Sequence, residues 1–191
     1  MLRKFAVACA VLIAASLLAA GSAWLLVLYG PSAGAIAVGP WRMSAVAGSV
    51  DADIYTRARV AITGLFALDA HETIYFEAST DDAGHKLRAG CTYRIDGAAL
   101  PARWWSVTAY GPDLFLIPNP INRFSFNMGN IGLVDGRFSI VAASTEQAGN
   151  WLPTGDRGFR LLVRLYNPQP AAVENPRLIA LPSIKAQGGC P

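Results

Sequence analysis

The pattern of apolar and polar residues changes twice along this chain. An uncharged, almost wholly apolar run extends from Phe5 to Tyr29. Apolar residues then recur at helical spacing between Asp53 and Leu68, and from Thr73 onward they alternate with polar residues. A period of two is typical of strands that bury one face. The pattern therefore predicts an apolar helix, a short amphipathic helix and then a mainly β domain.

The apolar run is long enough to cross a membrane. Its 25 residues extend about 37 Å as a helix, which exceeds a hydrocarbon core of about 30 Å. Arg3 and Lys4 precede the run, and the positive-inside rule then leaves the N-terminus in the cytoplasm. We expect a single-pass inner-membrane protein in which residues 1–29 are the cytoplasmic N-terminus and anchor. Residues 5–29 contact the membrane, and the C-terminal domain lies in the periplasm.

A cleaved signal peptide is the alternative to this anchor. Ala33-Gly34-Ala35 provides small residues at the spacing of a cleavage site, so the mature chain would begin near Ile36 and be secreted. The apolar part of a signal peptide is typically about 7–15 residues, much shorter than this run. The length of the run therefore favours the anchor.

The remainder divides into a tether and a domain. Residues 30–50 are rich in Gly, Pro, Ala and Ser, which predicts a tether. Residues 51–191 form the exported domain, which opens with one short helix from Asp53 to Leu68, capped by Asp51 or Asp53. The apolar face of this helix is predicted to consist of Ile54, Ala58, Ala61, Ile62, Leu65 and Phe66. The stretch from Asn167 onward, with several prolines, is expected to be an irregular arm.

Alternating segments after the helix predict strands. They are residues 73–80, 92–95, 104–110, 114–117, 137–142 and 159–166. Turn signals rich in Gly, Pro, Asn and Asp separate them. This arrangement is typical of an antiparallel meander or β-sandwich.

Composition and charge limit the partners. The chain has 191 residues, 53% hydrophobic and 15% charged, which fits one domain and argues against disorder. The net charge of +3 is small and scattered, so nucleic acid is not an expected partner. Without residues 1–29 the chain has fourteen basic and thirteen acidic residues, and this near-neutral total does not indicate an anionic partner.

Two cysteines lie beyond the apolar run. Cys91 and Cys190 form an even pair, and in an oxidising compartment such a pair predicts a disulfide. The alternative is two unrelated thiols, one of them on a frayed tail. Cys9 lies within the apolar run, where we interpret it as a small hydrophobic residue.

Several segments together resemble a known bacterial family, domain of unknown function 1214. They are Ala102–Tyr110, Ile117–Ser125, Gly149–Pro153 and Phe159–Tyr166. The segments come in the family's order within a match from about Trp41 to Pro182. The resemblance implies a jelly-roll-like β-sandwich, and short membrane-anchored members are similar over the full length, with a cysteine near each of the two positions found here. It supplies no accepted activity, substrate or catalytic residue.

Familiar catalytic and metal-binding motifs find little support. His71 and His85 belong to no cluster with ligand spacing, so neither a metal site nor a cofactor is expected. The chain has no G-x-S-x-G turn and no phosphate-binding glycine loop. Glu72 and Glu77 lie on opposite faces of their strand, because their spacing is odd. The other carboxylates fall mainly in turns, where Asp commonly stabilises the backbone.

The candidate ligand-binding residues are aromatic, basic and amide side chains. They are Trp104, Tyr110, Asn119, Asn122, Arg123, Asn150, Trp151 and Arg164, with Tyr166 beside them. Such groups stack on sugar rings and hydrogen-bond to hydroxyls. The alternative is that they fill the core and stabilise turns. Adjacent Trp104 and Trp105 must point to opposite faces of their strand.

Two classes of function remain open. The first is a binding or structural module at the outer face of the inner membrane, with an envelope glycan, lipid or protein as its partner. The second is an envelope enzyme, a glycan hydrolase or lyase that uses carboxylates in a cleft. The lack of a nucleophile motif and of a metal cluster favours the binding module.

Overall fold

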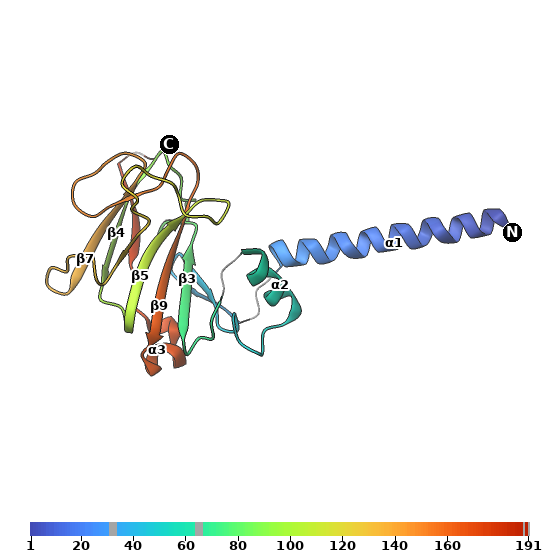
Figure 1. Ribbon diagram of the computed structural model, residues 1–191, viewed down its shortest axis with the longest axis horizontal. Helices are drawn as coiled ribbons and strands as arrows, with labels where there is room; N and C mark the ends of the chain where they lie inside the picture. Colours follow the sequence, from blue (N-terminus) through green and yellow to red (C-terminus); the bar gives the residue numbers. More distant parts are fainter. Residues whose placement is uncertain (31–33, 64–66, 189, 191) are drawn as a thin grey trace.

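The computed structural model describes residues 1–30, 34–63, 67–188 and 190. Figure 1 shows a long helix, α1 (Leu2–Tyr29), that projects away from a β domain. An 18-residue stretch of this helix has a mean hydropathy of 2.3, and the helix has no buried residue. Its length and composition are sufficient to cross a membrane. A signal sequence near the N-terminus can show the same length and composition.

The domain consists of two sheets. The six-stranded sheet is antiparallel throughout and has the order β1 (Ala35–Val38), β2 (Trp41–Ser44), β3 (Thr73–Ala78), β9 (Arg160–Pro168), β5 (Ala102–Tyr110) and β6 (Ser125–Asn127). The four-stranded sheet has the order β10 (Ser183–Gln187), β4 (Thr92–Ala98), β7 (Arg137–Ala143) and β8 (Trp151–Pro153). The predicted mainly β class is confirmed, although β7 and β8 pair in parallel, which the antiparallel prediction did not anticipate.

One hydrophobic core joins the two sheets. Trp105 of β5 stacks on Phe138 of β7, with 5.0 Å between ring centroids. Tyr93 of β4 meets Phe159 edge to face at 5.6 Å. Trp105 is 1% exposed whereas its neighbour Trp104 is 38% exposed, as the alternation of side chains along a strand requires.

A disulfide joins Cys91 to Cys190, so the predicted pairing is confirmed. Cys91 immediately precedes β4, and Cys190 lies three residues after the end of β10. The bridge therefore fastens the end of the chain to the four-stranded sheet.

The amphipathic helix α2 extends over Ile54–Thr63. The Asp53 carboxylate caps it by accepting hydrogen bonds from the backbone N–H groups of Tyr55 and Thr56. The hydrogen bonds from the side chain and backbone of Thr56 lower the pKa of Asp53, and partial desolvation of the carboxylate opposes this shift only in part. Residues 64–66, which include the predicted apolar positions Leu65 and Phe66, lie outside the described residues. A short helix α3 (Pro170–Glu174) and a 3-10 turn η1 (Pro176–Leu178) connect β9 to β10.

Three segments differ from the prediction. The expected tether contains the β1–β2 hairpin, whose buried Trp41 donates a 2.8 Å hydrogen bond from Nε1 to the Pro182 carbonyl. Residues 114–117 form no strand, because Leu114 has a positive φ of 68° and a single bridge links Leu116 to Tyr110. The expected irregular arm contains β10, which pairs with β4. Short edge strands carry too few residues for a periodic signal.

Candidate functional site

A groove of about 420 Å³ lies on the outer face of the six-stranded sheet. Strands β3 and β9 form its floor, and the β1–β2 hairpin, α2 and the turn after β5 form its walls. The polar side chains that line it are Arg42, Ser44, Thr56, Arg59, Thr63, Tyr75, Glu77, Ser79, Tyr110, Arg160 and Arg164. The remaining lining is apolar, and it includes Met43, Val60, Leu114 and Leu162.

Strand alternation places the floor residues together. In β9 the buried residues Leu161, Val163 and Leu165 face the core, so Arg160 and Arg164 face outward into the groove. The antiparallel register sets Tyr75 of β3 directly opposite Arg164. The groove is therefore built from two neighbouring strands whose outward faces are polar.

Arg164 and Tyr110 form the closest pair of groove side chains. The Arg164 guanidinium donates a 2.7 Å hydrogen bond to Tyr110 Oη. Its central carbon lies 5.4 Å from the centroid of the same ring, within the range of a cation–π contact. Both residues belong to the predicted ligand-binding set, and the structure brings them together.

The groove is strongly basic. Arg160 donates a 2.9 Å hydrogen bond to Glu77, and among the described residues that line the groove Glu77 is the only acidic one. Arg42 donates to the Gly39 carbonyl of its own hairpin at 3.0 Å. Four arginines against one carboxylate leave an excess of three positive charges. The near-neutral total charge of the chain beyond residue 29 concealed this concentration.

The fourth arginine links the groove to α1. Arg59 of α2 donates hydrogen bonds to the carbonyls of Leu26, Val27 and Gly30, at 3.1, 2.8 and 2.7 Å. The last carbonyls of a helix have no partner within the helix, and a cation there also interacts favourably with the helix dipole. One wall of the groove is thus attached to the end of the apolar helix.

Two other aromatic candidates lie farther along the same sheet face. Trp104 and Tyr166 meet edge to face, with 5.3 Å between ring centroids, in directly opposed positions of β5 and β9. Burial raises the pKa of the Tyr166 hydroxyl, and the Arg164 charge opposes this effect. Neither ring lines the groove.

The loop candidates have structural partners. The Asn119 side chain donates to the Ile117 and Arg123 carbonyls and accepts from the Arg123 N–H, which fastens the loop on itself. Asn122 has a positive φ of 51°, a conformation that Asn tolerates. Arg123 lies over the Phe126 ring at 5.2 Å. These contacts agree with the turn-stabilising alternative for the 119–123 loop.

The candidates Asn150 and Trp151 are similarly held by contacts within the fold. Trp151 is 7% exposed, and its Nε1 donates a 2.9 Å hydrogen bond to the Ala143 carbonyl. Arg123 donates a 3.4 Å hydrogen bond to the Trp151 carbonyl, so these two candidate residues are in contact. Asn150 donates to the Ser139 carbonyl and lines a separate hollow on the outer face of the four-stranded sheet. The eight predicted residues therefore occupy several places and form no single site.

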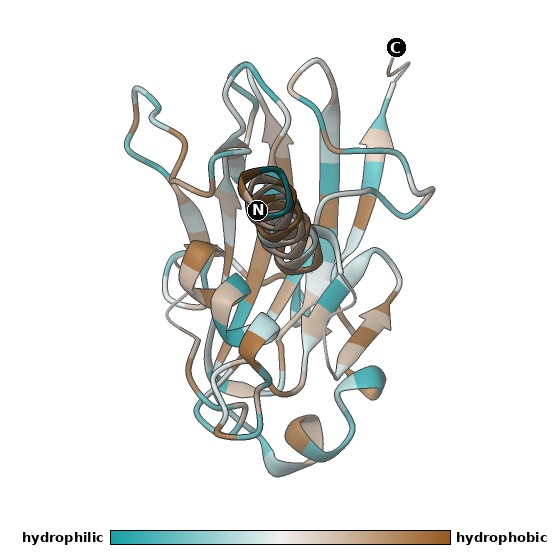
Figure 2. Ribbon diagram, turned by 90° about the vertical axis from the view of Figure 1, so that its right-hand side faces the viewer, coloured by the Kyte–Doolittle hydropathy of each residue, from teal (hydrophilic) through white to brown (hydrophobic). Residues whose placement is uncertain are grey.

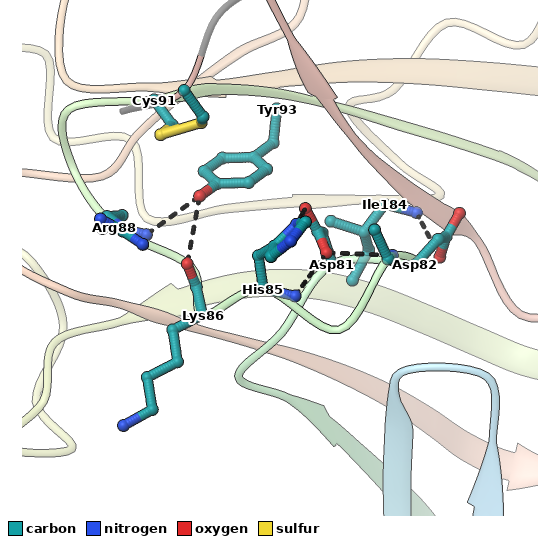
Figure 3. A network of polar contacts seen from close by, with 10 residues as sticks. Asp81, Asp82, His85, Lys86, Arg88, Cys91, Tyr93 and Ile184 are labelled. Carbon is teal, nitrogen blue, oxygen red and sulfur yellow. Dashed lines mark hydrogen bonds and ion pairs between the residues drawn. A yellow bond between two sulfur atoms is a disulfide. The ribbon is translucent and has the colours of Figure 1, made fainter.

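Figure 3 shows the hydrogen bonds that the polar residues near the disulfide form. The Asp81 carboxylate accepts hydrogen bonds from the backbone N–H groups of Ala83 and His85, and Asp82 accepts one from Ile184 N–H. Tyr93 Oη accepts a hydrogen bond from the Arg88 N–H. His85 is exposed in the turn that follows β3. These groups hold the connection between β3 and β4 in place.

The carboxylates offer limited material for catalysis. Asp113 and Asp156 line one cleft of about 410 Å³, where Arg157 lies 3.3 Å from Asp113. Within the described part of the chain, no three His, Cys, Asp or Glu residues gather as metal ligands would. The arginine-lined groove has a single carboxylate among its described residues, Glu77, and Arg160 donates a hydrogen bond to it.

Most of the groove was missed from the sequence. Alternation in residues 73–80 and 159–166 identified the polar faces that carry Tyr75, Glu77 and Arg160, but did not show that these faces adjoin. Arg42 lies in the segment expected to be a tether, and Arg59 lies on a helix whose packing was unknown. No local signal connects those two positions to the sheet.

Fold and site together define a mainly β domain with an arginine-lined groove beside an N-terminal apolar helix. The chain belongs to the family described as protein of unknown function (DUF1214), whose model matches residues 72–170. The matched region contains β3, β5 and β9, and thus the floor of the groove. No curated protein matches the chain.

Two solved structures are similar to this chain. The VPA0106 protein from Vibrio parahaemolyticus has 26% sequence identity and a TM-score of 0.60, and the match covers 72% of this chain and 36% of that one. A protein from Burkholderia cenocepacia has 21% identity and a TM-score of 0.43, over 63% of this chain and 31% of that one. This chain thus aligns with about a third of the length of each of these proteins.

Proposed function

We propose that the protein is a membrane-anchored binding module of the periplasm, with a β-sandwich domain whose groove takes an anionic amphiphile. The ligand would carry a phosphate or carboxylate head on an apolar body, as an anionic phospholipid does. α1 is the inner-membrane anchor in this proposal. The observation that carries it is the set of four arginines in a partly apolar groove attached to the end of α1.

The chemistry of the lining supports an anionic head. Arginine presents five N–H donors in a planar fork that matches phosphate and carboxylate oxygens. Arg164 faces the neutral hydroxyl of Tyr110, so its positive charge has no anion in that contact. An anion in the groove would supply this charge partner. The excess of positive charge over Glu77 favours anions over neutral ligands.

The apolar lining supports an amphiphile over a free sugar. Val60, Leu114 and Leu162 line the groove, and burial of an acyl chain against them would drive binding. A glycan hydrolase typically uses two carboxyl groups that flank the reacting bond. Glu77 is the only carboxylate among the described groove residues, and Arg160 engages it.

The test is ligand-dependent stabilisation of the full-length protein in detergent micelles. A ligand that binds only the folded state raises the melting temperature. We expect phosphatidylglycerol to raise it more than phosphatidylcholine does, and Arg164→Gln to abolish that difference. Arg103→Gln is the matched control, because Arg103 is exposed on β5 outside the groove, and it should keep the difference. Equal effects of the two lipids on the wild-type protein would contradict the proposal.

A further inference from the structure

The apolar stripe of α2 does not face the protein core. Ile54, Ala58, Ala61 and Ile62 recur at helical spacing, which predicts one buried face. Instead Ile54 is 74% exposed and Ile62 49% exposed, and Ala61 is also exposed. The other side of the helix, with Thr56, Val60 and Thr63, lines the groove. Among the described residues, most of the apolar side of this amphipathic helix is therefore exposed, and only Ala58 on it is half-buried.

The position of α2 indicates what covers that side. Arg59 holds α2 against the last turn of α1 through three backbone carbonyls, those of Leu26, Val27 and Gly30. Figure 1 shows α2 beside the domain end of α1, on the side of the domain from which α1 projects. Figure 2 looks along α1 and shows its predominantly hydrophobic ribbon in front of the domain. A bilayer around the end of α1 would therefore lie close to α2.

The end of α1 lies at the depth of lipid headgroups if the helix spans a bilayer. Its 28 residues extend about 42 Å, whereas a hydrocarbon core is about 30 Å thick. Trp24 and Tyr29 are exposed near this end, and such aromatic rings favour the membrane–water interface. The carbonyls that Arg59 binds lie at positions 26, 27 and 30, in the same part of the helix as these two rings.

We infer that α2 is an interfacial helix whose apolar stripe lies in the surface of the same bilayer that α1 spans. Amphipathic helices at an interface bury their apolar face about 5–10 Å into the boundary between headgroups and acyl chains. Arg57 is exposed on α2, where its positive charge suits anionic headgroups. Val50, just before the helix, is 87% exposed and extends the apolar surface.

This arrangement has a consequence for the domain. Two contacts, α1 and α2, then fix the side of the domain that meets the membrane, whereas one flexible tether would leave the domain free to turn. The side of α2 opposite its apolar stripe lines the groove, so the groove lies next to the membrane surface. The inference rests on α1, α2 and Arg59, and it holds whether or not the groove binds an anionic amphiphile.

The test measures the depth of α2 in lipid. The full chain, with Cys9→Ser, is reconstituted into vesicles of phosphatidylethanolamine and phosphatidylglycerol that carry a nitroxide high on the acyl chain. A fluorescent label is attached at Ile62→Cys, at Ile54→Cys or, as the matched control, at Val134→Cys. Val134 is also an exposed apolar residue, but it lines the hollow on the outer face of the four-stranded sheet. We expect the nitroxide to quench the labels at positions 54 and 62 several-fold more than the label at 134.

Equal quenching at the three positions would overturn the inference. A label at position 62 that is shielded from water but not quenched by lipid would also overturn it, because protein would then cover the stripe. Circular dichroism and an intact disulfide confirm that each labelled variant is folded. Arg164→Gln should leave the quenching at position 62 unchanged, so the failure of the groove proposal and the failure of this inference give different results.

Discussion

The Arg164 guanidinium donates a 2.7 Å hydrogen bond to the Tyr110 hydroxyl and lies 5.4 Å from the centre of the Tyr110 ring. The two residues come from β9 and β5, which are adjacent in the sheet but separated by 54 positions along the chain. The contact positions one of four groove arginines while pairing its charge with a neutral oxygen. It is therefore both a structural contact and a candidate part of a binding site.

Tyr110→Phe separates these two roles. The substitution removes the hydroxyl and keeps the ring, so it should lower the free energy of unfolding by about 1 kcal/mol, the usual net value of one hydrogen bond. The guanidinium stays in the groove, and the selective stabilisation by phosphatidylglycerol should persist. Urea unfolding with and without lipid measures both effects. Loss of the lipid effect in Tyr110→Phe alone would show that the hydroxyl, not the charge, recognises the ligand.

Two tryptophans should respond differently to truncation. Trp151 is buried and hydrogen-bonded to Ala143, so Trp151→Ala should cost about 3–5 kcal/mol of unfolding free energy. Trp104→Ala should cost about 1 kcal/mol, because this partly exposed ring loses mainly its edge contact with Tyr166. Chemical denaturation of both variants provides the comparison. An unfolding free energy of Trp151→Ala close to that of the wild type would contradict its role in the core.

The disulfide should contribute strongly to stability. It closes a loop between residues 99 positions apart and holds the chain end near β4. We expect Cys190→Ser to lower the free energy of unfolding by about 2–5 kcal/mol. Cys9→Ser is the control, since Cys9 lies in α1 and forms no disulfide. If reductant leaves the wild-type unfolding curve unchanged, the bridge carries little of the stability.

Asp96 gives a pH-dependent prediction. Burial raises its pKa, but hydrogen bonds from Arg94 and Ser139 and the charges of Arg94 and Lys185 outweigh this, so the pKa lies below its ordinary value. A carboxylate with a lowered pKa stabilises the fold above its unfolded pKa and loses that effect as the pH falls through the folded pKa. The difference in unfolding free energy between wild type and Asp96→Asn should therefore be constant above about pH 5 and shrink below about pH 4.

Arg94→Gln checks the cause of that pH dependence. Arg94 Nε donates to Asp96 at 2.7 Å, so its removal should raise the pKa of Asp96. In the Arg94→Gln background, the contribution of Asp96 should be smaller at neutral pH. Denaturation curves from pH 3 to about 7 measure this change. An Asp96 contribution that does not depend on Arg94 would assign the effect to Ser139 and Lys185.

The topology prediction concerns α1. A reporter enzyme that is active only in the periplasm should be active when fused after Pro191, and the intact mass should include residues 1–35. The hydrogen bonds from Arg59 to the end of α1 favour retention of the helix. A mature protein that begins near Ile36 would make the segment a signal peptide. Cleavage there would remove α1, and the membrane contact inferred for α2 would then be lost as well.

The sequence by itself determined what depends on neighbouring residues. The uncharged run predicted α1, and alternation predicted five of the ten described strands. The sequence offered Asp51 and Asp53 as N-caps of the helix, and Asp53 is the cap of α2. Trp104 and Trp105 had to face opposite sides of β5 for purely local geometric reasons. The cysteine pair followed from parity and compartment, which need no knowledge of the fold.

Only the tertiary structure decided what depends on contacts between distant segments. Alternation along a strand shows which side chains share a face, but it does not show whether that face contacts the core or water. The same limit applies to α2, whose apolar stripe predicted burial and lies exposed instead. The groove brings Arg42, Arg59, Arg160 and Arg164 together from a hairpin, a helix and one strand. Their convergence depends on strand order and register, which hydrogen bonds between remote segments establish and no local pattern encodes.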